Sequence, residues 1–208
     1  MKIARLDTYI VSVPYRHREN SARVRRDGVT AVLVRLTSDE GLVGWGECCP
    51  GPNIESIDAI VRATAPMLLG RDPWNSEKLA QHFFHTAHWD LREMSGNFAY
   101  AGIDMAIRDL QGKACDQPLY RLMGGRVRKE VDYFCYLAAG DPDSVAAQAA
   151  TARAQGYCVY YLKVGIDLPS ELDQVAALRE AIGSEGKIRI DANGAWSVAE
   201  AVRHLDEF

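Results

Sequence analysis

Three residues near the end of the chain have side chains suited to proton transfer and metal binding: Tyr161, Lys163 and Asp191. Lys163 lies in an otherwise apolar run, where burial would lower its pKa and let the amine act as a base near neutral pH. Asp191 is followed by Asn193 and Gly194, and a carboxylate at the end of a strand suits a hard cation such as Mg²⁺. A lysine base and a metal-binding carboxylate together predict abstraction of the proton next to a substrate carboxylate, with the metal ion stabilising the negative charge that forms.

The sequence leaves a structural interpretation open for each of these residues. Lys163 could form a salt bridge or face outward, Asp191 could be a hydrogen-bonded residue at a strand end, and Tyr161 could either donate a hydrogen bond or simply pack. One carboxylate does not make a metal site, so further ligands would have to come from elsewhere.

A strand–helix–strand unit is expected to position these side chains. Residues 159–165 and 187–194 are β-rich runs that end in a charged residue and a glycine, and residues 168–182 between them have helical periodicity. Such a unit normally makes neighbouring parallel strands. The spacing of its two strands is close to the roughly 31 residues that one βα unit occupies in a barrel of ~250 residues.

Alternation along the two strands predicts which side chains share a face. Tyr161 and Lys163 should lie on one face of the first strand, and Arg189 and Asp191 on one face of the second. Lys163 and Asp191 should therefore meet at the carboxyl ends of adjacent parallel strands, where α/β active sites usually lie.

The chain before this unit has a different pattern. Apolar spacing, glycines and capping residues predict strands at 3–13, 29–36 and 42–47, helices at 56–69, 76–92, 98–114 and 119–123, a strand at 131–138, and helices at 142–155 and 198–208. Candidate N-caps are Asn75 or Ser76, Asn97, Asp141 and Ser197. The fold class is therefore an α+β domain at 1–125, followed at 126–208 by alternating strands and helices.

Residues 126–208 accommodate only the first three βα units of a barrel. An open sheet of three parallel strands would leave its edges exposed. We therefore expect the chain to be truncated relative to its own pattern: either the barrel continues beyond Phe208 or another chain completes it.

Two other polar features of the sequence are candidate sites. Segment 14–28 carries five arginines and lacks an apolar face, which predicts a mobile loop that is either merely solvated or a lid contacting an anionic substrate. His82, His85 and His88 suggest a metal site, but spacings of three drift around a helix by about 60° each, so a structural role is favoured.

Composition excludes several classes of protein. The 208 residues are 48% hydrophobic and 25% charged, as in an ordinary globular protein, and the net charge of −4 gives no general attraction to nucleic acid or anionic membrane. Five cysteines without metal spacing indicate reduced thiols. No signal-peptide core and no apolar run of ~18 residues is present, so a cytoplasmic protein is expected.

Several motifs occur together in a characteristic order along the whole chain. They are Gly41–Glu47 (GLVGWGE), Ala101–Lys113 (AGIDMAIRDLQGK), Pro118–Tyr120 with Gly124-Gly125, Leu162–Gly165 (LKVG) and Asp191–Gly194 (DANG). In this order and spacing the chain resembles the enolase superfamily, of the muconate-lactonizing enzyme/mandelate racemase type.

The resemblance implies a capping domain at 1–125 and the start of a (β/α)₇β barrel at 126–208, with one Mg²⁺ ion. Asp191 matches the first metal ligand, and Lys163 matches the second lysine of the Lys-x-Lys motif, the general acid/base. Two further acidic ligands and a second base would lie after Phe208. The segments 14–28 and 48–53 match loops that close over the substrate. Tyr15, Ile54 and Asn193 are the candidate substrate-binding residues. The resemblance also implies a small-molecule carboxylate substrate and a homo-oligomer.

One residue departs from the family pattern. Tyr161 replaces the first lysine of the motif, which normally lowers the pKa of the second by like-charge repulsion, so Lys163 should have a higher pKa here. A Tyr-x-Lys motif is similar to the cis-3-hydroxy-L-proline dehydratase branch, which implies a carbon–oxygen lyase acting on a small hydroxy-amino acid. The alternatives are a racemase, epimerase or cycloisomerase of an amino-acid-like carboxylate, and, in another class, a non-catalytic partial-barrel fragment or scaffold.

Overall fold

The computed structural model describes residues 1–50, 53–86 and 94–208 and divides the chain into two compact units. The N-terminal unit consists of Met1–Val13 and Val29–Lys129, and the C-terminal unit of Pro14–Gly28 and Glu130–Phe208. The sequence pattern changes near residue 126, but it does not predict that residues 14–28 group with the C-terminal unit. Each unit has its own core and is described by itself.

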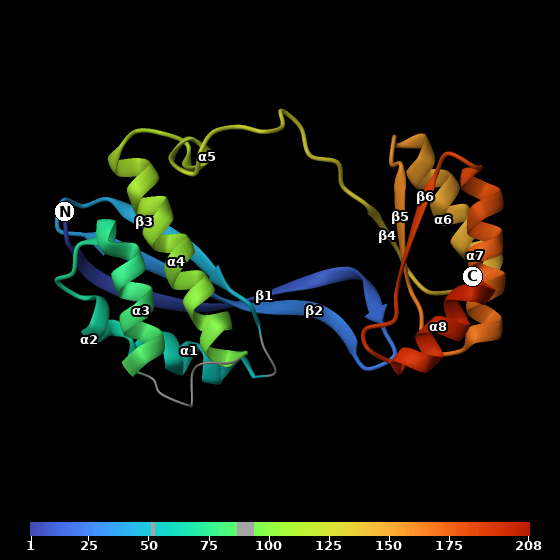
Figure 1. Ribbon diagram of the computed structural model, residues 1–208, viewed down its shortest axis with the longest axis horizontal. Helices are drawn as coiled ribbons and strands as arrows, with labels where there is room; N and C mark the ends of the chain where they lie inside the picture. Colours follow the sequence, from blue (N-terminus) through green and yellow to red (C-terminus); the bar gives the residue numbers. More distant parts are fainter. Residues whose placement is uncertain (51–52, 87–93) are drawn as a thin grey trace. The chain divides into compact units, whose positions relative to one another are not determined.

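A three-stranded sheet in the order β1-β2-β3 carries the helices of the N-terminal unit (Figure 1). The elements are β1 (Ile3–Asn20), β2 (Arg25–Ser38), β3 (Val43–Cys48), α1 (Ile54–Ala63), α2 (Ala65–Leu68), a 3₁₀ turn η1 (Pro73–Asn75), α3 (Ser76–Thr86), α4 (Ser95–Ala114) and α5 (Leu119–Leu122). Strands β2 and β3 pair antiparallel, and Gly41 in their connection has a positive φ of 85°, which glycine adopts without strain.

Glycines allow β3 to lie directly against α4. A Cβ atom added at Gly46 would be 1.9 Å from the carbonyl oxygen of Gly102, and one added at Gly44 would be 2.1 Å from that of Ala106. The predicted apolar stripe of α4 is buried, including Ile103 and Ile107 at 0% exposure. The close backbone approach explains why this part of the sequence is rich in small residues.

Two helix predictions in this unit need correction. The helix predicted at 56–69 begins earlier, at Ile54, where the Asn53 side chain accepts a hydrogen bond from the Ser56 N–H (2.8 Å). It is broken at Thr64, because Pro66 stands in the first turn of α2. Helix α4 begins at Ser95, so the cap predicted at Asn97 is wrong and this residue lies within the first turn. The predicted continuation of α3 over 87–92, with His88, lies outside the described residues.

The loop predicted at 14–28 is instead the end of a β-hairpin. Strands β1 and β2 are hydrogen-bonded neighbours that continue to Asn20 and from Arg25, and the Ser21 N–H donates to the Val24 carbonyl (2.9 Å) between them. Arg18 and Asp27 form an ion pair across the hairpin (2.6 Å). These strands could not be predicted from the sequence, because the end of the hairpin is largely exposed and so lacks an alternating apolar pattern.

The C-terminal unit contains a three-stranded parallel sheet in the order β4-β5-β6 (Figure 1). Its elements are β4 (Cys135–Leu137), α6 (Pro142–Ala154), β5 (Val159–Lys163), α7 (Leu168–Ile182), β6 (Lys187–Asp191) and α8 (Val198–Glu207). The three predicted βα units are therefore confirmed, together with the caps at Asp141 and Ser197. Closure of such units into a barrel remains a prediction.

Helices α6 and α7 cover one face of this sheet. Tyr160, Leu162 and Leu137 point into the core between sheet and helices, where they are at most 1% exposed. The opposite face carries Tyr161 and Lys163, whose side chains are the subject of the next section. The alternation predicted for this strand is thus confirmed.

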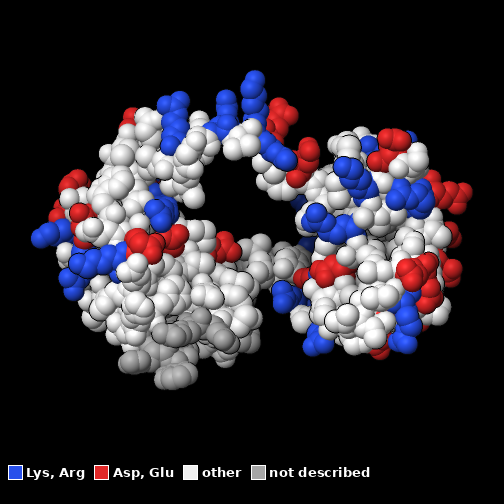
Figure 2. Space-filling model, viewed as in Figure 1, with Lys and Arg blue, Asp and Glu red and all other residues white. Residues whose placement is uncertain are grey.

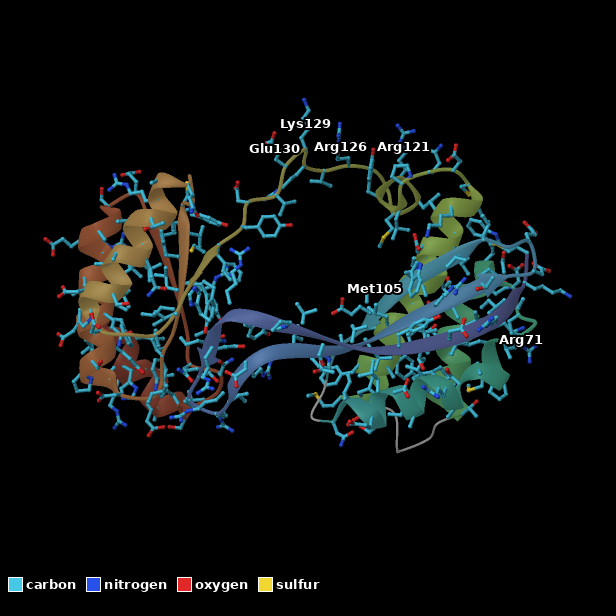
Figure 3. All side chains as sticks on the ribbon, turned by 180° about the vertical axis from the view of Figure 1, so that it is seen from behind. Arg71, Met105, Arg121, Arg126, Lys129 and Glu130 are labelled. Atoms are coloured by element: carbon cyan, nitrogen blue, oxygen red, sulfur yellow. The ribbon has the colours of Figure 1, made fainter. Side chains whose placement is uncertain are left out.

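Strand β4 is shorter than the predicted 131–138. Val131 and Tyr133 are 71% and 78% exposed, and pairing with β5 begins only at Cys135. Apolar residues in this segment have β propensity, but propensity alone makes no strand where no neighbour pairs with it. In Figure 3 the side chains of Arg126, Lys129 and Glu130 extend outward from the segment before it.

Charged side chains are mixed on the face of the molecule that Figure 2 shows, with Lys and Arg interleaved with Asp and Glu on both units. Among the described residues no helix has the length and apolar character needed to cross a bilayer.

Candidate functional site

The register of the parallel sheet brings the predicted catalytic residues together. Lys163 pairs with Asp191 and Tyr161 with Arg189, so Lys163 and Asp191 end adjacent strands at the same edge. The strand-end placement predicted for this pair is confirmed.

Lys163, Tyr161 and Asp191 form a closed triangle of hydrogen bonds. The Lys163 Nζ donates to Asp191 Oδ2 (2.9 Å) and to the Tyr161 hydroxyl oxygen (2.8 Å), and the Tyr161 hydroxyl donates to Asp191 Oδ2. Only 9% of the Lys163 side chain is exposed. Lys163 thus forms the salt bridge, and Asp191 the hydrogen bonds, that a structural role would require. Both roles are compatible with a part in catalysis.

The hydrogen bonds of the triangle favour the charged forms of Asp191 and Lys163. Hydrogen bonds from Tyr161 and then Lys163 lower the pKa of Asp191 to about 2. Burial lowers the pKa of Lys163, but its hydrogen bonds with Tyr161 and Asp191 raise it more, so the net shift is upward. The expectation that burial lowers the pKa of this lysine is therefore wrong in the hydrogen-bonded triangle. The other expectation, that the pKa is higher because Tyr161 replaces the first lysine, agrees in direction with the upward shift.

Asn193 holds Asp191 in place. Its backbone N–H donates to Asp191 Oδ1 (2.8 Å) and its side-chain amide donates to Oδ2 (3.2 Å). Asn193 adopts a positive φ of 49°, which asparagine tolerates better than most residues. The guanidinium of Arg23, on the hairpin, donates to the Gly194 carbonyl and ties the same loop down. Direct substrate binding by Asn193 stays a prediction.

A buried carboxylate that the sequence did not single out fixes the loop after Lys163. Glu171 is 4% exposed and accepts hydrogen bonds from the backbone N–H groups of Gly165 (2.9 Å), Ile166 (2.7 Å) and Asp167 (3.0 Å). Its only signal in the sequence is an acidic residue in the first turn of a helix that follows a glycine.

A cavity of about 350 Å³ lies over Lys163 within the C-terminal unit. Its lining residues come from the hairpin and from the open face of the sheet: Tyr15, His17, Glu19, Phe134, Tyr136, Tyr161 and Lys163. Of the candidate substrate-binding residues, Tyr15 is thus brought to the cavity. The sequence missed His17 and Glu19, because the hairpin was interpreted as a loop whose arginines would make the contacts.

Ile54 belongs to the N-terminal unit, where it begins α1 and packs against the hydrophobic core. A substrate contact by Ile54 stays a prediction that the C-terminal unit by itself does not test.

Asp191 is the one candidate metal ligand predicted among the described residues. Asp191 is ionised and oxygen-bearing, which fits a hard cation, but the described residues contain no group of three or more His, Cys, Asp or Glu side chains that could hold a metal ion. The further acidic ligands expected after Phe208 stay a prediction. In the described part of α3, the ring Nδ1 of His82 lies 3.3 Å from the Thr86 hydroxyl, which fits a structural role.

The chain matches two protein-family descriptions. Residues 5–124 match "Mandelate racemase / muconate lactonizing enzyme, N-terminal domain", and residues 144–208 match "Enolase C-terminal domain-like". Together they cover both units.

Relatives with assigned activities cover nearly all of the chain. N-succinyl-L-Arg/Lys racemase of Bacillus cereus is 28% identical over 94% of this chain and 53% of its own length, and its crystal structure superposes with a TM-score of 0.90 over 100% of this chain and 56% of that one. Cis-3-hydroxy-L-proline dehydratase of Roseibium aggregatum is 31% identical over 98% of this chain and 56% of its own length.

A dipeptide epimerase of Enterococcus faecalis, crystallised with Mg and the dipeptide L-Leu-L-Tyr, has a TM-score of 0.89 at 26% identity over 99% of this chain and 58% of that chain. Other matched relatives are described as epimerases and cycloisomerases. This chain spans about half the length of the curated relatives it matches.

Proposed function

The chain belongs to the mandelate racemase/muconate lactonizing enzyme family of the enolase superfamily, and from this premise we propose that the protein abstracts the proton α to a substrate carboxylate. The observation that carries the proposal is the position of the Lys163 Nζ, 2.9 Å from Asp191 and beside a cavity. Lys163 is the proposed base, Asp191 the metal ligand and Tyr161 the partner of both.

Lys163 must lose its own proton before it can accept one from the substrate. In the hydrogen-bonded triangle its pKa is raised, so the state described here is the ammonium form. The Mg²⁺ ion that Asp191 would help to hold would supply positive charge, which favours the neutral amine and offsets negative charge on the substrate carboxylate. Tyr161 and Asn193 keep the Asp191 carboxylate oriented whichever partner it has.

We propose more finely that the reaction is dehydration of a small hydroxy-amino acid such as cis-3-hydroxy-L-proline. Lys163 takes the α-proton, and the electron pair of that C–H bond forms a double bond to the β-carbon. The β-hydroxyl leaves with its bonding pair and a proton, returned by the Lys163 ammonium or donated by Tyr161, as water. The Tyr-x-Lys pair and the matched dehydratase support this choice.

The second candidate is epimerisation, racemisation or cycloisomerisation of an amino-acid-like carboxylate. It is favoured by the number of matched relatives with such activities. It would need a second base or a different fate for the same carbanion, and Lys163 would play the same part in the first step.

The test is made on the protein that contains this chain at its natural length, with Mg²⁺ and cis-3-hydroxy-L-proline in D₂O. Loss of water supports dehydration, whereas deuterium at the α-carbon of recovered substrate with inverted configuration supports epimerisation. Lys163→Ala should abolish either reaction and Asp191→Asn should weaken Mg²⁺ binding, while Lys187→Ala, an exposed lysine on the neighbouring strand, is the matched control. Turnover by Lys163→Ala equal to that of the control would refute the assignment.

A non-catalytic scaffold is the remaining class. It predicts no turnover at natural length and no Mg²⁺ affinity beyond that of a single carboxylate. Titration of Mg²⁺ by calorimetry separates it from both enzyme classes.

A further inference from the structure

We propose that Glu19 binds the positively charged nitrogen of an α-amino acid substrate and so selects substrates with an ionised amine. The inference rests on the proposed function, in which Lys163 faces the α-proton. It adds a residue on the hairpin that decides which carboxylates are accepted.

The carboxylate of Glu19 has unused capacity to accept hydrogen bonds. Its Oε1 lies 3.9 Å from the Lys163 Nζ, which is an ion pair but too long for a hydrogen bond. Within the described residues its side chain accepts no hydrogen bond, although only 24% of it is exposed. A partly shielded carboxylate such as this is stabilised by a donor, and a cationic N–H group is the strongest kind.

The rest of the cavity also suits an organic cation. Tyr161 stacks with Phe134 (ring centroids 4.8 Å apart) and lies 5.6 Å from Tyr136, so aromatic rings line the wall beside Glu19. The Lys163 Nζ is 5.0 Å from the Tyr161 ring centroid, which shows that a cation is already accommodated at such a ring. An anionic group placed at Glu19 would be repelled instead.

The order of charged groups around Lys163 matches the substituents of an α-carbon. Asp191 lies 2.9 Å from the Lys163 Nζ and Glu19 lies 3.9 Å from it. If the α-proton faces Lys163 and the substrate carboxylate lies toward Asp191, the α-nitrogen is the polar substituent left for Glu19. Free or N-alkylated amines, which are charged, should therefore bind, whereas N-acylated amino acids and sugar acids have no charge to offer.

The rival interpretation is that Glu19 acts only through Lys163, as its distant ion-pair partner. The variant Glu19→Gln separates the two because it keeps the shape and removes the charge. Binding is measured by calorimetry on the natural-length protein with Mg²⁺, using L-proline, which has no 3-hydroxyl to lose, and N-acetyl-L-proline, which has no charge on nitrogen. Glu180→Gln, an exposed carboxylate of α7, is the control.

We expect Glu19→Gln to weaken L-proline binding about tenfold or more, the size expected for loss of a paired charge, and to leave N-acetyl-L-proline binding unchanged or tighter. With a reactive substrate the variant should raise KM more than it lowers kcat. Equal effects on the charged and uncharged ligands, or a change confined to kcat and its pH profile, would overturn the proposal.

The two proposals fail in different ways. Charge-dependent binding of L-proline without any turnover would support the role of Glu19 and refute the proposed reaction. Turnover together with L-proline binding that Glu19→Gln leaves unaltered would do the reverse.

Discussion

Replacing Glu171 by glutamine should destabilise the C-terminal unit by about 3 kcal/mol, because its buried carboxylate accepts hydrogen bonds from three backbone N–H groups. Hydrogen bonds to a charged acceptor contribute about 1.5–3 kcal/mol each. The amide keeps one oxygen, so at least one N–H of Gly165, Ile166 or Asp167 loses its acceptor and faces an NH₂ group. The bonds that remain lose the negative charge that strengthens them.

This magnitude is large enough to measure by urea unfolding. With a slope of about 1–3 kcal/mol per M urea, a loss of about 3 kcal/mol lowers the midpoint by roughly 1–3 M. Hydrogen exchange should accelerate at Gly165–Asp167, the loop that follows Lys163, and turnover should fall with it. The matched control is Glu180→Gln, an exposed glutamate of the same helix.

The reasoning fails if Glu171→Gln and Glu180→Gln have the same urea midpoint. A shift in the midpoint without faster exchange at Gly165–Asp167 would also refute it, because the stabilisation would then have another origin. Glu171→Ala, which removes all three acceptor bonds, should be more damaging than Glu171→Gln.

Three further predictions concern packing, capping and ionisation. Gly46→Ala places a Cβ atom 1.9 Å from the Gly102 carbonyl oxygen, so β3 and α4 must separate by about 1 Å. We expect the free energy of unfolding to fall by about 3 kcal/mol, and an unchanged Tm in thermal unfolding would contradict the packing described for α4. Ser197→Ala removes the capping box of α8 and should cost about 1 kcal/mol, measured by urea unfolding, whereas Ser197→Asp, which keeps an acceptor, should not. Burial raises the pKa of Cys48 to about 11, so its thiol should resist iodoacetamide at pH 8 in the folded protein, as peptide mapping would detect. Because the folded state then holds this proton more tightly than the unfolded state does, the stability that Cys48 contributes is complete below about pH 9 and is lost as the pH rises toward 11; labelling of Cys48 as fast as that of an exposed thiol would contradict its burial.

Much of the C-terminal unit could be predicted from the sequence. The period of two in 159–163 and 187–191 and the helical period of 168–182 are local properties, and they were enough to place Lys163 and Asp191 at one edge of a parallel sheet. Asp141 and Ser197 were predictable caps for the same reason, since a capping side chain bonds to backbone only three residues away.

Predictions that needed partners distant in the chain were weaker. Segment 14–28 has no apolar pattern, so its pairing as a hairpin could not be predicted. Residues 131–134 have β propensity but no neighbouring strand to pair with. The pKa of Lys163 was expected to fall through burial, yet two hydrogen-bond partners raise it, and one of them is supplied by another strand.

The sequence by itself thus determined which side chains share the reactive face of the sheet, because alternation along a strand needs no tertiary information. Only the tertiary structure decided what surrounds Lys163. Glu19 reaches it from a hairpin near the start of the chain, and Glu171 secures the loop behind it through backbone N–H groups that carry no mark in the sequence. Contacts of this kind depend on the direction in which distant segments approach one another, and no local pattern of residue types encodes that direction.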